Sequence, residues 1–397
     1  MKAIGKALIA FPLFYGSYQY YMLSKRQVPK EATMTFQEYC EYKGLSVQSH
    51  LVTTQDGYNL TLFRVSKGKE PDKNKTPVIM VHGLTHSSIS FVIAQNSTPP
   101  AVRLIDEGYD VWLLNTRGNY YSRTHQTLDP KSKEYWQWCS NHIGQYDIPA
   151  SIDYVLKGTG KKRINYIGHS QGGFVGLYCL TMLPKYGEKV NVMVVWAPPG
   201  GGKIAAKSQY LADIFKESFL QDLESKGINF IADWSPIPND SAVYAYTFPY
   251  LAAWKYKDKY DVSLEKEDAS VLSIYLQQFS GGTSVMNLRY LQQLIQRNAP
   301  IAYMFDYGKD ENIKKYGQEI PPIIHYANIR AKIAVMYGKH DDVCTMDNGE
   351  NLAALLPKRW LIFKKFDYDV DHAGFAVSPN QKHMDDVLKI FKEHELQ

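Results

Sequence analysis

The chain has 397 residues, of which 45% are hydrophobic and 21% are charged. That length suits one large α/β domain with an insertion, or two domains. Its 45 basic and 40 acidic residues leave a formal net charge of only +5, and no basic run is longer than Lys161-Lys162-Arg163. Such balanced charge argues against nucleic-acid binding, so we expect no nucleic-acid partner.

The N-terminus has the pattern of a secretory signal. Lys2 and Lys6 precede an apolar run over residues 7–16, which has the length of a signal-peptide core. No convincing small-residue cleavage site follows, so residues 1–25 fit a signal peptide or an uncleaved signal anchor, with an ordinary helix as a third alternative. Four N-glycosylation sequons agree with this route: Asn59, Asn74, Asn96 and Asn239. We therefore expect the secretory pathway, with secretion or a lysosomal lumen as destination and membrane anchoring left open.

Short apolar runs alternate with helical patterns along most of the chain. Residues 45–66 predict a β-hairpin around the turn Asp56-Gly57. Apolar runs that suit buried parallel strands follow at 76–83, 108–116, 164–168, 190–198, 332–338 and 359–366. Helical patterns lie between them, at 146–158, 172–183 and 346–356. This alternation predicts an α/β fold, a mostly parallel sheet with helices on both faces.

Residues 199–300 interrupt the alternation and carry two amphipathic helical patterns. The apolar positions are Leu211, Ile214, Phe215, Phe219 and Leu220 in the first pattern, and Val285, Leu288, Leu291 and Ile295 in the second. A helical block inserted directly after a strand indicates a cap over an active site, although any single helix could instead pack on the core. We therefore divide the chain into a leader at 1–25, a core at 26–198 and 301–397, and a helical cap at 199–300.

The segment INYIGHSQGGFVGLY, residues 164–178, is the main chemical motif. Strand-type residues run into Gly168, Ser170 and Gly172 and then into a helical pattern. A serine on a sharp strand-to-helix turn, with glycines two residues before and after it, is the nucleophile elbow of α/β-hydrolases. The glycines are needed because the turn is strained and the strand and helix approach each other closely. A glycine-rich turn with a serine helix cap is the plainer alternative.

A serine hydroxyl needs a base, and the base needs an acid that holds its tautomer. In this fold class the acid and then the histidine follow the serine along the chain. GKHDD, residues 338–342, follows a late strand and offers Asp341, with Asp342 as its rival and a helix cap as the structural alternative. His372 follows the last strand, whereas the two later histidines lie in charged, helix-like sequence. We therefore predict Ser170 as nucleophile, Asp341 as acid and His372 as base.

Two backbone N–H groups must stabilise the oxyanion that forms on the substrate. Gln171, directly after the nucleophile, supplies one, and Leu84 in the HGL loop after an early strand is in place for the other. We expect His82 and His169 to be structural. His82 and His86 have the i, i+4 spacing of a metal pair, but they lack the H-E-x-x-H glutamate and fall in a loop at a strand end, so we predict no metal site.

The sequence contains neither a complete phosphate-binding loop nor a zinc-binding cysteine pattern. APPGGGKIAAK, residues 197–207, lacks the glycine and the Ser/Thr that a Walker A phosphate loop needs, because Ala197 and Ile204 occupy those positions. No C-x-x-C or zinc pattern is formed by the four cysteines, which are Cys40, Cys139, Cys179 and Cys344. One disulfide is compatible with their spacing, and four unpaired, mostly buried thiols are at least as compatible.

The chain resembles the acid lipases, the group that contains gastric lipase and lysosomal acid lipase. The blocks that carry the resemblance are DGYNL (56–60), HGL with Ser87-Ser88 (82–88), GYDVWLLNTRGNYYSR (108–123), YDIPASIDYVL (146–156), GHSQGG (168–173) and GGTSVMN (281–287). They occur in the family's order, and the similarity covers nearly the whole mature chain. NTRGNYYSR and YDIPA are far more specific than the serine motif.

The resemblance implies the α/β-hydrolase fold with an inserted helical lid, and hydrolysis of the carboxylic esters of neutral lipids, either triacylglycerols or sterol esters. The site residues it implies are Ser170, Asp341 and His372 as triad, with Leu84 and Gln171 as oxyanion donors. The resemblance implies no metal or organic cofactor. The partners it implies for the protein are a lipid ester substrate and a lipid–water interface, with no obligate protein partner evident. The segments GKHDDVCT and VDHAGF, which contain the predicted acid and base, differ from the sequences usual in the family. No cysteine lies between Cys179 and Cys344, so a disulfide within the lid is excluded.

Other functions share these motifs. A thioesterase or a general carboxylesterase would use the same triad, and a hydrolase-fold lipid-binding protein could have lost turnover. An intact serine, acid and histidine in the right order argue against the binding protein, because binding alone gives no reason to keep all three.

Overall fold

The computed structural model describes residues 31, 34–68, 74–94, 97–201, 215–231 and 281–395. Every helix and strand named below belongs to one compact unit, Phe36–Asp233 with Phe279–Gln397. The predicted leader at 1–25 and the middle of the predicted cap lie outside the described residues. None of the helices in the part of the chain that the structure describes combines the length and the apolar character needed to cross a membrane.

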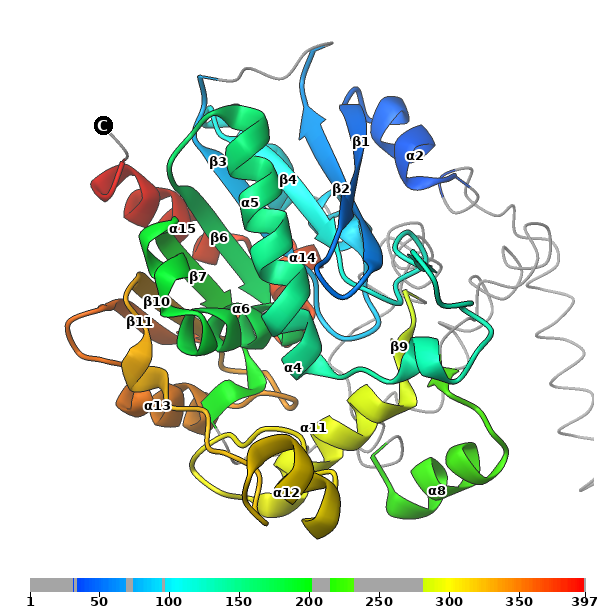
Figure 1. The fold of residues 1–397 in the computed structure, drawn as a ribbon. Helices are drawn as coiled ribbons and strands as arrows, with labels where there is room; N and C mark the ends of the chain where they lie inside the picture. Colours follow the sequence, from blue (N-terminus) through cyan, green and yellow to red (C-terminus); the bar gives the residue numbers. More distant parts are fainter. Residues whose placement is uncertain are drawn as a thin grey trace, which may run out of the picture. The chain divides into compact units, whose positions relative to one another are not determined.

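Nine strands of the described residues form one mixed sheet (Figure 1). In chain order they are β1 Ser46–Thr53, β2 Tyr58–Ser66, β3 Pro77–Val81, β4 Asp110–Asn115, β5 Thr124–His125, β6 Ile164–His169, β7 Val190–Trp196, β10 Lys332–Gly338 and β11 Leu361–Tyr368. Their order in the sheet is β1-β2-β4-β3-β6-β7-β10-β11, with β5 paired to β2. Neighbours from β4 to β11 are parallel, and β2 pairs antiparallel with β1, β4 and β5. The prediction of an α/β fold with a mostly parallel sheet is confirmed.

Helices cover both faces of the sheet, because each connection between parallel strands must cross over outside it. In front of the sheet in Figure 1 lie α5 (Ile148–Thr159) and α6 (Gln171–Met182), and behind it lie α14 (Gly374–Val377) and α15 (Lys382–Glu393). The other α-helices that the described residues form are α2 Phe36–Tyr42, α3 Pro100–Asp106, α4 Ser140–His142, α8 Glu217–Ser225, α11 Val285–Arg297, α12 Lys309–Tyr316 and α13 Met346–Leu355. The helices predicted before, at and after the serine motif correspond to α5, α6 and α13.

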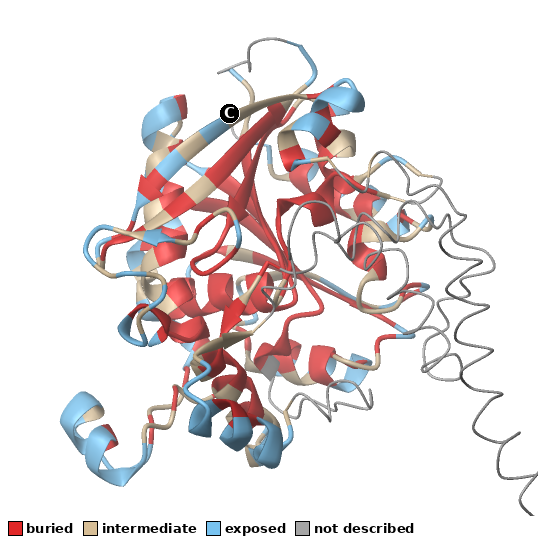
Figure 2. Ribbon diagram, turned by 90° about the vertical axis from the view of Figure 1, so that its right-hand side faces the viewer, coloured by how far each residue is buried: buried red, intermediate tan, exposed pale blue. Residues whose placement is uncertain are grey.

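The central strands are buried along their whole length (Figure 2). No residue of β3, β4, β6 or β7 is exposed. Helices on both faces remove any need for a polar side, so these strands appear in the sequence as continuous apolar runs. The edge strands β1 and β11 mix buried and exposed residues.

Helices α8 and α11, which belong to the predicted cap, pack against each other. They share one buried apolar cluster, made of Leu220, Leu223, Val285 and Leu288. Arg289 on α11 adds two ion pairs to α8, at 2.6 Å from Glu217 and 2.7 Å from Glu224. A short antiparallel pair of strands, β8 (Phe230–Ile231) and β9 (Thr283–Ser284), lies next to them in the chain. This part of the predicted cap is therefore fixed within the same unit as the core.

The structure corrects the first amphipathic pattern of the cap. That pattern assumes one helix that includes all its apolar positions, whereas α8 begins only at Glu217. Phe215 therefore precedes the helix, and Phe219 is 37% exposed while Leu220 is completely buried. The first two apolar positions of the pattern lie outside the described residues. The second pattern is confirmed by α11, which buries three of its four apolar residues and half-buries Ile295.

Candidate active site

Ser170 lies on the turn between β6 and α6, in a backbone conformation that residues other than glycine rarely adopt. Its φ is 50° and its ψ is −121°, and its side chain makes no capping hydrogen bond to α6. Neighbouring side chains would not fit. A Cβ on Gly168 would lie 2.5 Å from the backbone of Gly172, and a Cβ on Gly172 would lie 2.1 Å from the carbonyl oxygen of Val81. The geometry is that of a nucleophile elbow and not of a serine-capped turn.

The structure brings the three residues of the predicted triad together. The Oγ of Ser170 is 2.9 Å from Nε2 of His372, and Nδ1 of His372 is 2.7 Å from Oδ2 of Asp341. His372 lies in the loop between β11 and α14, and Asp341 lies in the loop after β10. The hydroxyl, imidazole and carboxylate form one continuous hydrogen-bonded chain.

Asp341 is held in place through its other oxygen. Its Oδ1 accepts hydrogen bonds from the backbone amides of Val343 at 2.8 Å and Cys344 at 2.7 Å, and the side chain is completely buried. Because the bond from His372 is made to this residue, the structure supports Asp341 over its rival Asp342. Burial, and then the adjacent Asp341 charge, raise the pKa of Asp342.

The charges around His372 favour its protonated form. Burial is the largest single effect and lowers the pKa of the imidazole, but the bonded Asp341 and the other nearby carboxylates together outweigh it, and the pKa of His372 is raised. Asp371 and Asp342 add to the same effect. A histidine that accepts the serine proton must become an imidazolium, so these carboxylates stabilise the charge that such a step creates.

His169, next to the serine, binds the backbone of the loop that carries His372. Its Nε2 donates to the carbonyl oxygen of His372 at 2.8 Å. Its Nδ1 then carries no proton, and within the described residues this buried nitrogen has no hydrogen-bond partner. Burial, and then the neighbouring His372, lower the pKa of His169 to about 3, so the ring is neutral. His82 also bonds backbone, at the carbonyl oxygen of Gly83, so both histidines have the contacts of structural residues.

Of the two residues predicted to supply oxyanion donors, Gln171 directly follows Ser170, and Leu84 belongs to a loop that passes against it. Gln171 is the first residue of α6, where backbone N–H groups have no partner within the helix. Leu84 follows Gly83, where an added Cβ would lie 3.2 Å from the Cβ of Ser170. The next residue, Thr85, has a φ of 60°, in the left-handed region. The loop after β3 therefore passes against the serine in a strained conformation.

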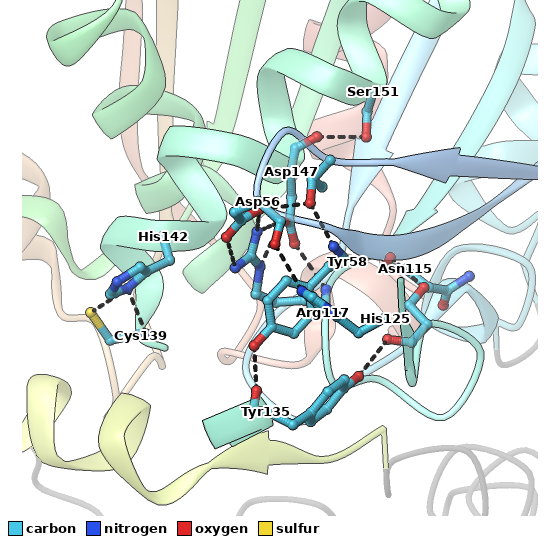
Figure 3. Close-up of polar contacts among 12 residues, drawn as sticks. Asp56, Tyr58, Asn115, Arg117, His125, Tyr135, Cys139, His142, Asp147 and Ser151 are labelled. Carbon is cyan, nitrogen blue, oxygen red and sulfur yellow. Dashed lines mark hydrogen bonds and ion pairs between the residues drawn. The ribbon is translucent and has the colours of Figure 1, made fainter. Parts of the chain in front are cut away.

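A buried ionic cluster centred on Arg117 is not predicted by any of the motifs (Figure 3). The guanidinium donates to Asp147 at 2.7 Å and to the two oxygens of Asp56 at 2.7 and 2.8 Å. It also lies 4.0 Å from the centroid of the Tyr58 ring. The cluster holds one positive and two negative charges, and burial, only partly offset by Arg117, raises the pKa of Asp147 to about 6. The sequence signal is that Asp56, Arg117 and Asp147 each lie in a segment that carries the family resemblance.

All four cysteines are free thiols, and all four are buried. Burial raises the pKa of Cys40 and of Cys139 to about 12, and it also raises the pKa of Cys179 and of Cys344. Of the two alternatives left open by the sequence, the structure supports four unpaired thiols. In the described part of the chain, no three His, Cys, Asp or Glu side chains are grouped as a metal ion would need.

Comparison with known proteins shows the family to which the chain belongs. The sequence-family model of the α/β hydrolase fold matches residues 76–379 of this chain. The family model of the partial α/β-hydrolase lipase region matches residues 36–95. Lipase member K of Mus musculus is 28% identical over 376 residues, which cover 91% of this chain and 92% of that protein. Gastric triacylglycerol lipase of Bos taurus is 28% identical over 384 residues, with the same shares covered. The lip1 structure from Acinetobacter baumannii, at 13% identity, covers 94% of this chain and 99% of its own with a TM-score of 0.51, which is a likeness of fold alone.

Proposed function

Because the chain belongs to the α/β-hydrolase fold family, we propose that it cleaves the carboxylic ester bonds of neutral lipids through an acyl-enzyme on Ser170. The chain is an ester hydrolase by family, and its resemblance to the acid lipases is confirmed over most of its length. The observation that carries the proposal is the hydrogen-bonded chain from Ser170 through His372 to Asp341.

The proposed mechanism begins when Nε2 of His372 accepts the proton of the Ser170 hydroxyl as the oxygen attacks the ester carbonyl carbon. The amides of Leu84 and Gln171 stabilise the oxyanion of the tetrahedral intermediate. The intermediate collapses as His372 gives the proton to the leaving alcohol. Water, activated by the same imidazole, then releases the carboxylic acid, and Asp341 keeps the imidazole in the productive tautomer.

Triacylglycerols or sterol esters are the proposed substrates, and a lipid–water interface is the proposed surface of action. One relative is named for triacylglycerol. Leu84 lies against the apolar cluster of α8 and α11, and Phe219 on α8 is 37% exposed. Phe219 belongs to the helix whose buried residues pack against Leu84, and we propose that its partly exposed ring contacts lipid. The alternatives are a thioesterase, a general carboxylesterase and a non-catalytic lipid-binding protein.

Activity on a long-chain ester is expected to rise when the substrate passes from monomer to emulsion. Binding to the lipid surface removes apolar side chains of the enzyme from water, which is favourable by roughly 25 cal/mol per Å² and so favours the form bound to its substrate. Phe219→Asp should reduce that rise several-fold and leave hydrolysis of a short soluble ester within about two-fold of wild type. The measurement is the initial rate per enzyme below and above the solubility limit. Leu220→Asp is the contrasting variant, because its buried charge should prevent folding.

Each alternative has its own outcome in this experiment. Faster cleavage of thioesters than of oxyesters would favour the thioesterase, and a preference for short soluble esters without any rise on emulsions would favour the general carboxylesterase. Absence of turnover on every ester would favour the binding protein. Equal losses on both substrates in Phe219→Asp would assign Phe219 to the folded core.

Asp341→Asn is expected to lower kcat on the order of 10⁴-fold, because an amide holds His372 in the wrong tautomer. Asp342→Asn, one residue along the chain, is the matched control, and its loss should stay below about ten-fold. Both are measured on a short soluble ester, with circular dichroism as a check of folding. A larger loss at Asp342 would overturn the assignment of the acid.

We also propose that the chain enters the secretory pathway and is secreted or reaches a lysosomal lumen. The apolar pattern at 7–16 and the sequons support this route. Asn74 is exposed in a turn, where an oligosaccharide has room. Asn59 instead lies within β2, and its side chain donates to Thr124 at 3.2 Å. Of the sequons in the described residues, Asn74 is therefore the favoured site of glycosylation.

A further inference from the structure

Residues 281–287, which we call the bracing segment, contact the loop that carries Leu84 and the side chain of Gln171, the two residues proposed as oxyanion donors. The segment contains β9 and the start of α11. Thr283, Ser284 and Asn287 are each 1% exposed or less. Ser284 caps α11 by accepting a hydrogen bond from the Asn287 amide at 2.9 Å, so the helix begins at a fixed place. Most of the segment is therefore buried, and its helical end is held by a cap.

Its first contact is with the loop that carries Leu84. The Gly281 amide donates to the carbonyl oxygen of Thr85 at 2.8 Å. A side chain would not fit there, because an added Cβ on Gly281 would lie 2.2 Å from the carbonyl oxygen of His86. The φ of 60° at Thr85 is unfavourable for a β-branched residue and persists only where the surroundings hold it. Gly281 is one of the groups that hold it.

Its second contact is with Gln171. The Nδ2 of Asn287 donates to Oε1 of Gln171 at 2.7 Å, and Oδ1 of Asn287 accepts from the amide and the hydroxyl of Ser140, each at 2.7 Å. A backbone amide can only donate, so the Asn287 oxygen must face Ser140 and its nitrogen must face Gln171. Gln171 is 4% exposed and the other two residues are completely buried, so water does not compete for these bonds.

We propose that Asn287 is a positioning residue for the oxyanion hole. The substrate oxygen develops its charge at one point, and both donor nitrogens must lie about 2.7–3.1 Å from that point. Leu84 belongs to the loop after β3, whereas Gln171 is the first residue of α6. The bracing segment bonds to both places, through Gly281 and Asn287. The segment thereby sets the distance between the two amides. This inference rests on the proposed function, because it has meaning only if Ser170 carries out acyl transfer.

Asn141 on α4 is a matched buried asparagine that lacks this connection. It is 6% exposed. Its Oδ1 accepts from the Phe305 amide at 2.9 Å, and its Nδ2 donates to the hydroxyl of Tyr290 on α11 at 3.0 Å. Like Asn287, it joins the α4 region to other parts of the fold through one donor and one acceptor. Neither of its partners carries a proposed oxyanion donor, so it reports the purely structural effect of losing such bonds.

The test compares Asn287→Leu, Gln171→Met and Asn141→Leu on a short soluble ester. Leu copies the branched shape of Asn without its hydrogen bonds, and Met at 171 keeps the backbone amide while removing the Oε1 acceptor. Asn287→Leu and Gln171→Met should lower kcat about 10-fold to 100-fold with KM within about two-fold, the pattern of an interaction made only in the transition state. Affinity for a boronic acid, which forms a tetrahedral adduct on serine, should fall by the same factor. Asn141→Leu should lower Tm by about as much as Asn287→Leu does, but it should keep kcat within about two-fold of wild type.

The double variant Asn287→Leu/Gln171→Met should lose no more kcat than the worse single variant, because the bond between Asn287 and Gln171 is already lost in each single variant. Equal kcat losses in Asn287→Leu and Asn141→Leu would overturn the inference. If Asn287→Leu does not fold, Gln171→Met decides, and an unchanged kcat in that variant would overturn it too. Wild-type protein that neither hydrolyses esters nor reacts with a fluorophosphonate at Ser170 would instead refute the proposed function.

Discussion

Replacing Ser170 or His372 by alanine is expected to lower kcat on the order of 10⁶-fold, and replacing both should lower it little further. Without the imidazole the hydroxyl keeps its proton, and without the hydroxyl the imidazole has nothing to deprotonate, so the two groups act as a unit. The 2.9 Å contact between Oγ and Nε2 already places them for this transfer. The measurement is kcat on a short soluble ester for both single variants and the double variant.

His340→Ala is the control for the loss at His372. His340 lies one residue before Asp341, is exposed, and bonds to Asp369 at 2.9 Å. Its removal should change kcat by less than about two-fold. A Ser170→Ala variant that kept a tenth of the activity would show that Ser170 is not the nucleophile.

Arg117→Met is expected to lower the free energy of unfolding by about 3–5 kcal/mol at neutral pH. The change leaves Asp56 and Asp147 close together without their shared cation, and the Asp147 side chain is completely buried. Asp147→Asn should lower the free energy of unfolding less, by about 1–2 kcal/mol, because it leaves one cation and one anion. Urea unfolding at pH 7, followed by circular dichroism, measures all three proteins.

Acidic pH should reduce the deficit of Arg117→Met. The pKa of Asp147 in the folded chain is about 6, above the ordinary value of 3.8. A raised pKa favours folding most below 3.8, and that contribution is lost as pH rises through about 6. Without Arg117 the two carboxylates should bind protons at still higher pH, so the gap to wild type should be smaller at pH 5 than at pH 7. A gap that stays constant or widens in acid would contradict this account.

The elbow and the triad could be predicted from the sequence because their signals are local. Ser170 needs glycines two residues away on each side, and those glycines are visible in the chain. Asp341 and His372 each follow an apolar strand, and parallel strands bring their carboxyl ends to one edge of the sheet. From eleven histidines, fold class and chain order select the one whose Nε2 lies 2.9 Å from Oγ of Ser170.

The buried contacts that support the site could not be predicted in the same way. His169 and His372 are 203 positions apart, and Asn287 and Gln171 are 116 positions apart. Neither pair has a fixed spacing, and a polar residue in the sequence does not show whether it will be buried. The prediction of where α8 begins is wrong for a related reason. An apolar pattern identifies the buried face of a helix more reliably than the first residue of the helix. Burial of Leu220 beside an exposed Phe219 depends on that first residue.

The buried thiols give the folded chain reporters of its own opening. Thiol reagents attack the thiolate, and burial both excludes the reagent and keeps each sulfur protonated, with a pKa of about 12 for Cys40 and Cys139. The four sulfurs lie in separate places: Cys40 on α2, Cys139 before α4, Cys179 on α6 and Cys344 after the Asp341 loop begins. Each becomes reactive only when its own element opens. The labelling rate at each cysteine would therefore map the local opening free energy from the edge of the sheet to the loop of Asp341, with no introduced probe.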